Sequence, residues 1–156
     1  MKTDAVGFFP INYDDLAERP EFEGMTKAYR AEVGHKDYID GVLDEGFYRK
    51  AQAEGRMGIY AMQVNDALAG FFTLMFCEVP HATMLSATVE SFYIAPAYRG
   101  YAKWALAMLA EAAKDRGAPG VLVTAPVGSR MDRWMQLLKK EPAYKGYYIE
   151  GPRNEQ

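Results

Sequence analysis

The most regular pattern in the chain is an apolar strand that leads through a short turn into an amphipathic helix, over residues 89–117. The strand, residues 89–94, is apolar and aromatic around a single carboxylate, Glu90. Pro96 ends it, because proline has no amide hydrogen to give to a sheet and favours extended geometry in the residue before it. From Ala102 onward, strong helix formers repeat an apolar face, and Gly117 ends the helix. That face comprises Trp104, Ala105, Met108, Leu109, Ala112 and Ala113.

Helices are predicted before this unit, and strands on both sides of it. Segments with helical periodicity come first, with an interruption at Pro20, and segments with strand alternation follow, two of them joined by the turn Asn65-Asp66. This order predicts an α/β fold with a mixed, mostly antiparallel sheet flanked by helices. The predicted helices span residues 13–16, 21–33 and 37–53, and the predicted strands span residues 58–64, 70–79 and 121–125 besides 89–94, with residues 81–86 as a connection.

Length and composition indicate one globular domain. A chain of 156 residues that is 49% hydrophobic can fill one core. We therefore expect a single domain over residues 1–156, with residues 1–10 and 151–156 as loosely ordered tails. The net charge of -3 argues against a general nucleic-acid binder, which usually carries a basic face.

Cysteine usage and the short apolar segments indicate a cytoplasmic protein without a membrane anchor. Cys77 is alone, so no disulfide framework exists, and its apolar surroundings predict an inert core thiol. The apolar run before Pro10 is too short for a signal peptide, and no window approaches the length of a membrane span. His35 and His81 lie far apart, with no ligands at metal-binding spacing, so no metal site is expected.

The turn between the central strand and its helix has the features of an anion site. A strand that feeds a helix through a glycine-containing turn directs free amide groups and the positive end of the helix dipole at whatever lies above it. Arg99 adds a positive charge at the same place. The alternative is an ordinary strand-to-helix crossover in which Arg99 is a solvated surface residue.

The segment FYIAPAYRG and the apolar helix after it resemble motif A of the GNAT superfamily, the acyl-CoA-dependent N-acyltransferases. In that motif an Arg or Gln is followed by two small residues at fixed spacing, and these positions fall on Arg99, Ala102 and Trp104. Trp104 departs from the pattern, because small residues there let backbone and cofactor approach closely. The resemblance implies acetyl-CoA as co-substrate and no metal, with the pyrophosphate held by Arg99, Gly100, Tyr101, Ala102, Lys103 and Trp104.

The same resemblance implies how the sheet receives the cofactor. In the GNAT fold the strand that ends here at Ile94 splays from the strand that starts at Val121, and the acyl-CoA lies between them. Backbone groups near Phe92, Tyr93 and Ile94 would hold the pantetheine and the acyl carbonyl. The layout is most similar to small single-domain GNAT proteins of bacteriophage genomes, which would place the protein in a host cytoplasm, and dimers are frequent in the superfamily.

Glu90 is the candidate catalytic base. Transfer of an acyl group from a thioester to an amine needs a neutral amine, and a carboxylate in a partly buried strand can take its proton. By the two-residue period of a strand, Glu90 is expected on the same face as Phe92 and Ile94. GNAT proteins often carry a glutamate on this strand. The alternative is a strand glutamate that reaches solvent or pairs with a lysine.

The family pattern is weaker near the C-terminus. Ser129 falls in the segment where GNAT proteins carry an asparagine; it caps a helix with an apolar face of Met131, Trp134, Leu137 and Leu138, and we assign it to cofactor binding. The general-acid tyrosine of the family falls on Met135 or Gln136, neither of which is an acid. Among Tyr144, Tyr147 and Tyr148, which follow, Tyr144 is our candidate replacement.

Three functions remain open at this point. The first is an N-acyltransferase that acts on an amine of a small molecule or protein. The second is a catalytically degenerate GNAT fold that serves as a binding, inhibitory or host-interaction protein, which the residue at position 104 and the missing tyrosine favour. The third differs only in substrate, an amine of hypermodified phage DNA, and the acidic composition does not favour it.

Overall fold

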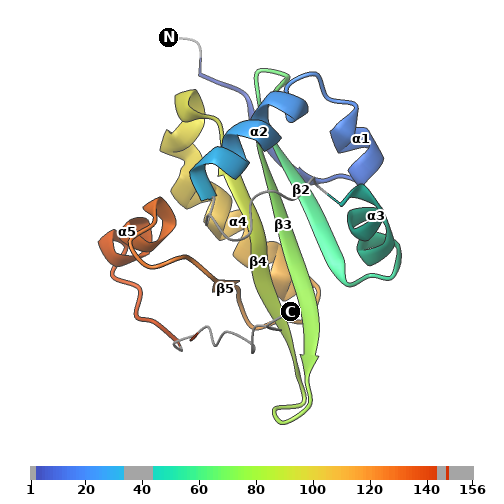
Figure 1. The fold of residues 1–156 in the computed structure, drawn as a ribbon, viewed down its shortest axis with the longest axis vertical. Helices are drawn as coiled ribbons and strands as arrows, with labels where there is room; N and C mark the ends of the chain where they lie inside the picture. Colours follow the sequence, from blue (N-terminus) through green and yellow to red (C-terminus); the bar gives the residue numbers. More distant parts are fainter. Residues whose placement is uncertain (1–2, 34–43, 144–146, 148–156) are drawn as a thin grey trace, which may run out of the picture. The chain divides into compact units, whose positions relative to one another are not determined.

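The computed structural model describes residues 3–33, 44–143 and 147, which fall into two compact units divided after Thr124. Within the first unit the described residues form a five-stranded sheet in the order β1-β2-β3-β4-β5 (Figure 1). Its strands are β1 (Val6–Pro10), β2 (Met57–Val64), β3 (Ala67–Val79), β4 (Met84–Ile94) and β5 (Leu122–Val123). Its helices are α1 (Tyr13–Ala17), α2 (Phe22–Val33), α3 (Glu45–Ala53), the 3-10 helix η1 (Pro96–Tyr101) and α4 (Ala102–Asp115).

The sheet is mixed, as the sequence predicts. Strands β1 to β4 pair antiparallel with their neighbours, and β5 pairs parallel with β4. Only two residue pairs join β4 to β5, Thr88 with Leu122 and Val89 with Val123. The predicted separation of these two strands is therefore confirmed, because β4 runs on to Ile94 after its pairing with β5 has ended.

One strand was not foreseen. Residues 1–10 were expected to be a loosely ordered tail, but Val6–Pro10 form β1 and pair with β2. The side chain of Phe8 explains the difference, because its ring stacks on Tyr60 of β2 with 5.5 Å between centroids. A five-residue strand has little signal of its own in the sequence, and this one depends on its partner strand and on Phe8.

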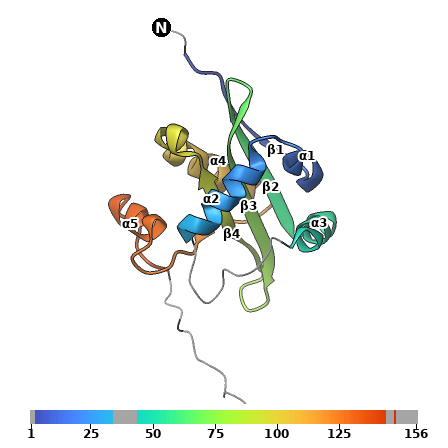
Figure 2. The ribbon, with the colours of Figure 1, turned by 45° about the horizontal axis from the view of Figure 1, so that its top comes forward.

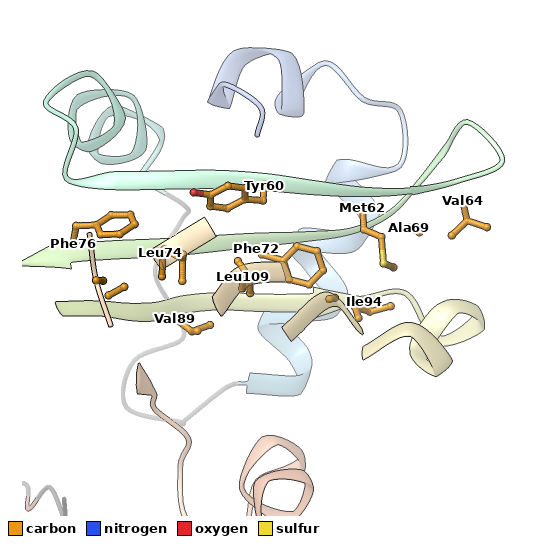
Figure 3. Packing of buried hydrophobic residues seen from close by; sticks show 14 residues of the cluster. Tyr60, Met62, Val64, Ala69, Phe72, Leu74, Phe76, Val89, Ile94 and Leu109 are labelled. Atoms are coloured by element: carbon orange, nitrogen blue, oxygen red, sulfur yellow. The ribbon is translucent and has the colours of Figure 1, made fainter. Parts of the chain in front are cut away.

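One face of the sheet packs against α4. The predicted helix face is confirmed for Ala105, Leu109 and Ala113, which are fully buried against the sheet, whereas Trp104 of the same predicted face is 37% exposed. The small alanines let the helix approach the sheet closely, and the larger side chains come from the strands. Figure 3 shows these strand residues along β2, β3 and β4, with Leu109 of α4 among them. They include Tyr60, Met62, Val64, Phe72, Leu74, Val89 and Ile94.

The opposite face is covered by α1, α2 and α3, and Figure 2 shows α2 crossing over β3 and β4. This second core contains Tyr13, Leu16, Phe22, Met25 and Ala51 from the helices and Ile59, Ala61, Leu68, Phe71 and Tyr93 from the strands. The predicted helix over residues 37–53 is confirmed only from Glu45, because the side chain of Asp44 caps it by accepting from the Phe47 amide at 3.0 Å. Residues 37–43 lie outside the described residues.

The turns follow the sequence closely. Asn65 and Asp66 have φ values of 49° and 68°, the left-handed conformation of a two-residue hairpin. The predicted connection over residues 81–86 is shorter than expected, because β4 already begins at Met84. Cys77 is exposed, so its assignment as a core thiol was wrong. The reason is that β2 pairs with β3 only as far as Met75, and Cys77 lies beyond that point.

The second unit, from Ala125, contains the helix α5 (Arg130–Leu137) in its described part. Ser129 caps this helix as predicted, because its hydroxyl accepts from the Asp132 amide at 3.2 Å. The predicted apolar face is not buried throughout, since Leu137 is 80% exposed. No helix in the described ranges combines the length and the apolar character needed to cross a membrane. A single domain over the whole chain stays a prediction.

Candidate functional site

Glu90 lies at a bulge in β4. Thr73 of β3 pairs with Ser91, and the next residue of β3, Leu74, pairs with Val89, so Glu90 is an extra residue in its strand. A bulge changes the direction of the side chains that follow it. The expectation that Glu90 shares a face with Phe92 and Ile94 was therefore wrong. The two-residue period holds only along an uninterrupted strand, and here the bulge breaks it.

Two hydroxyl groups hold the Glu90 carboxylate on the face covered by α2 and α3. The Tyr48 hydroxyl donates to Oε1 at 3.0 Å, and the Thr73 hydroxyl donates to Oε2. The Tyr29 hydroxyl donates to the backbone carbonyl of the same residue at 3.3 Å. Glu90 is nevertheless an exposed residue, so the carboxylate is fixed and can still be reached from solvent.

Thr73 and Ser91 are buried polar residues, each 3% exposed, and they bond to each other. The Ser91 amide, which the bulge displaces from the ladder, donates to Thr73 Oγ1 at 3.0 Å. The two hydroxyl oxygens lie 2.7 Å apart. Because the hydroxyl hydrogen of Thr73 goes to Glu90, Ser91 is the donor of this pair. The result is a chain of hydroxyls from Ser91 through Thr73 to the carboxylate.

The two phenols around Glu90 remain protonated over a wide pH range. Burial raises the pKa of Tyr48, and the Glu90 carboxylate raises it further. The pKa of Tyr29 is raised by the same two causes in the same order. Both groups therefore act as hydrogen-bond donors to Glu90 at any pH near neutrality.

The position of Tyr48 depends on contacts between α1 and α3. Its ring stacks on Tyr13 of α1 with 5.6 Å between centroids. Arg49, the next residue, pairs with Asp14 of α1 at 2.7 Å and lies over the Tyr13 ring. Sequence reasoning missed both Tyr48 and Thr73, because neither belongs to a local motif: they lie 42 and 17 residues from Glu90 in the chain.

The turn before α4 fits an anion. It is a 3-10 helix that runs directly into α4, and neither the cap residue Tyr101 nor the first turn of α4 places an acidic side chain at the positive end of the helix. A Cβ atom added at Gly100 would meet nothing within 4 Å, so the space beside this residue is open. Lys103 lies in the first turn of α4 and is exposed.

Arg99 does not point freely into solvent. Its guanidinium forms an ion pair with Glu32 of α2, and its Nε donates to the Ile94 carbonyl at 3.2 Å. The two charged side chains are only 30% and 34% exposed. Arg99 therefore joins the end of α2 to the end of β4 in this structure. The alternative of a solvated surface arginine is not what the structure shows.

Trp104 packs against β1. Its indole packs edge-on against Phe8 of β1, with 6.2 Å between centroids, and is 37% exposed. Tyr101 is likewise directed to the N-terminal segment, where its hydroxyl donates to Asp4 at 3.1 Å. Trp104, which stands where motif A usually has a small residue, thus packs on β1, the strand that the sequence did not predict. Ala102 packs against the core below the turn.

The remaining predicted site residues separate into three groups. Phe92 packs on Phe72 with 4.9 Å between centroids, whereas Tyr93 stacks on Phe71 on the opposite face of the sheet. Ile94 lies in the core on the α4 side. Ser129 belongs to the second unit, where it caps α5. Tyr144 lies outside the described residues.

Among the residues that the structure describes, no group of three or more His, Cys, Asp or Glu side chains could hold a metal ion.

Comparison with solved structures identifies the fold. No protein-family model matches the sequence, and no curated protein is significantly similar to it. A ribosomal-protein-alanine N-acetyltransferase from Brucella melitensis is 18% identical with a TM-score of 0.70, over 94% of this chain and 99% of that chain. A predicted acetyltransferase from Clostridium acetobutylicum, solved with acetyl-CoA, is 14% identical with a TM-score of 0.70, over 94% and 96% of the two chains.

A GCN5-related N-acetyltransferase from Ralstonia eutropha is similar in the same way. It is 16% identical with a TM-score of 0.68, over 94% of this chain and 100% of that chain. At these identities the likeness concerns the fold, and it extends over nearly the whole length of each protein. The chain has the GNAT fold, the fold of the GCN5-related N-acetyltransferases, which confirms the fold that the resemblance implied.

Proposed function

We propose that this protein transfers an acetyl group from acetyl-CoA to a primary amine, with Glu90 as the general base. The observation that carries the proposal is the Glu90 carboxylate, which is held by two hydroxyl donors at a strand bulge and remains exposed. Acetyl-CoA would supply the acyl group as a thioester, so the enzyme needs no covalent intermediate. The acceptor class is an amine of a small molecule or a protein.

The role of Glu90 is to take a proton from the attacking amine. Each carboxylate oxygen has two lone-pair sites, and the hydrogen bonds from Tyr48 and Thr73 occupy one site on each. The remaining sites accept the amine N–H groups, and the two fixed donors keep the carboxylate from turning. Tyr48 and Thr73 act through Glu90 and are positioning residues.

The turn between β4 and α4 is the proposed place of the CoA pyrophosphate. Its open side at Gly100, the positive end of α4 and Lys103 fit an anionic group. Backbone groups of Tyr93 and Ile94 would hold the pantetheine where β4 has left its pairing with β5. Arg99 fits a phosphate only after it leaves Glu32, so we propose that it exchanges this partner when the cofactor binds.

A second candidate function is a catalytically degenerate GNAT fold that binds a partner without turnover. Two observations favour it: Arg99 is already paired within the protein, and position 104 carries an indole where the family has a small residue. Turnover measurements separate the two candidates, because a degenerate protein does not consume acetyl-CoA in the presence of any amine.

The Glu90→Gln variant tests the proposed function. Glutamine keeps the size of the side chain and one oxygen that accepts from a hydroxyl group, but it cannot take a proton. We expect turnover of acetyl-CoA with an amine to fall about 100-fold or more, which is the range for loss of a general base. The dissociation constant for acetyl-CoA, measured by calorimetry, should stay the same. An unchanged turnover rate would exclude Glu90 as the base, and cofactor binding without turnover in the wild type would favour the degenerate protein.

A further inference from the structure

A small cavity lies between the sheet and the three helices that cover the Glu90 side. Its volume is about 60 Å³, and its walls are mostly apolar. Leu16, Phe22, Ile59 and Phe71 line it, together with Tyr13 and with Arg30, whose Nε donates to the Thr26 carbonyl at 3.4 Å. These side chains come from α1, α2, β2 and β3, so the cavity is part of the second core of the sheet.

The cavity shares its walls with the Glu90 site. Three of its lining residues bond directly to Glu90: Tyr48 and Thr73 to the carboxylate, and Tyr29 to the backbone carbonyl. Ser91, whose hydroxyl also lies in the wall, bonds to Thr73. If the amine of an acceptor binds the Glu90 carboxylate, the carbon atoms next to that amine therefore lie beside the cavity.

The chemistry of the walls selects apolar groups. Four of the wall hydroxyls already donate to partners in the protein. Tyr48 and Thr73 donate to the Glu90 carboxylate, Tyr29 donates to the Glu90 carbonyl, and Ser91 donates to Thr73. Thr26 of α2, at the wall of the cavity, donates its hydroxyl hydrogen to the Glu23 carbonyl at 2.9 Å. A cationic group that enters would lose water beside the positive charge of Arg30, without an equivalent gain of hydrogen bonds.

The volume limits the size of that group. A space of about 10–15 Å³ holds one water-sized group, so about 60 Å³ admits about four to six non-hydrogen atoms. We propose that the acceptor is a primary amine with a compact branched aliphatic group of this size, which fills the cavity while the amine meets Glu90. This inference rests on the proposed acetyltransferase activity.

A panel of three amines tests the acceptor class. 3-Methylbutylamine carries a branched group of the right size, ethylamine is too short to fill the cavity, and 1,4-diaminobutane has a similar reach but a second charge. Each buried methylene changes an equilibrium about fourfold, so kcat/KM for 3-methylbutylamine should exceed that for ethylamine by about 50-fold. 1,4-Diaminobutane should be no better than ethylamine.

A matched pair of variants on α2 ties this preference to the cavity. Thr26→Leu places a larger side chain in the cavity wall. Lys27→Leu is the control: it introduces a leucine at the neighbouring position, where the lysine side chain is 66% exposed. Thr26→Leu should lower kcat/KM for 3-methylbutylamine at least tenfold and leave ethylamine unchanged. Lys27→Leu should change neither. If Thr26→Leu does not fold, Thr26→Ala replaces it and should shift the preference towards the larger 3,3-dimethylbutylamine.

The outcomes separate the inference from the function on which it rests. Turnover of all three amines at similar rates, or an equal loss for all of them in Thr26→Leu, overturns the acceptor class and leaves the acetyltransferase proposal standing. No turnover of the three amines by folded wild-type protein that binds acetyl-CoA overturns the acceptor class. The acetyltransferase proposal is overturned with it if lysine-containing peptides are not acetylated either.

Discussion

Glu32 forms an ion pair with the Arg99 guanidinium in this structure, and its removal should change cofactor affinity in a direction that can be predicted. The perturbation is Glu32→Gln, which keeps the side-chain shape and removes the charge that holds Arg99. If Arg99 binds the CoA pyrophosphate, the wild-type protein must first break this ion pair. The variant has no such ion pair to break, so it should bind acetyl-CoA more tightly.

The magnitude follows from the exposure of the pair. Both side chains are about one third exposed, at 30% and 34%, so solvent screens their attraction. Partly exposed ion pairs contribute about 0.5–1 kcal/mol. Breaking the pair therefore costs a few-fold in affinity, and Glu32→Gln should lower the dissociation constant of acetyl-CoA about two- to fivefold.

Titration calorimetry of acetyl-CoA measures this effect, and a matched variant controls for net charge. Glu23→Gln removes the same charge from the same helix, at a side chain that is 81% exposed and pairs with Lys27. Acetyl-CoA is anionic, so the loss of any carboxylate increases its affinity slightly, and Glu23→Gln measures that general contribution.

Two results would refute the reasoning about Arg99. The first is a dissociation constant for Glu32→Gln no lower than for Glu23→Gln. The second is a gain from Glu32→Gln that persists in the Arg99→Gln background, because the gain must act through Arg99. In either case the ion pair between α2 and the turn has a structural role, and the pyrophosphate is held by other groups.

The raised pKa of Tyr29 and of Tyr48 and the packing of Gly70 give two further predictions. Since both folded-state pKa values lie above the ordinary value of 10.0, the stability that these tyrosines contribute is complete below pH 10 and is lost as the pH rises further. Urea unfolding of Tyr48→Phe should show a smaller loss of stability above pH 10 than the wild type; identical curves would contradict this. A Cβ atom at Gly70 would lie 2.6 Å from a backbone carbonyl of β4, so Gly70→Ala should destabilise by about 1–3 kcal/mol. Gly24→Ala on α2, where the added atom meets nothing, should stabilise instead, and equal melting temperatures for the two variants would refute the argument.

Local patterns in the sequence were sufficient for most of the secondary structure. The periodicity of residues 102–115, the glycine at 117 and the turn Asn65-Asp66 depend on near neighbours, and the structure has them where they were predicted. The order of these elements and motif A were sufficient for the fold, which the structural neighbours confirm. The strand β1 was missed, because five residues form a strand only when a partner is present to pair with them.

The candidate site depends on contacts between segments that are distant in the chain. Glu90 stands out in the sequence as the one carboxylate of an apolar strand, but the face on which it lies is set by a register shift between β3 and β4. Its partners Tyr48 and Thr73 come from another helix and another strand, and Arg99 meets Glu32 across 67 positions of the chain. The sequence by itself determined the elements and their order, because short-range periodicity governs both. Only the tertiary structure decided which polar groups meet, because hydrogen bonds and ion pairs between distant residues form after the strands and helices have packed.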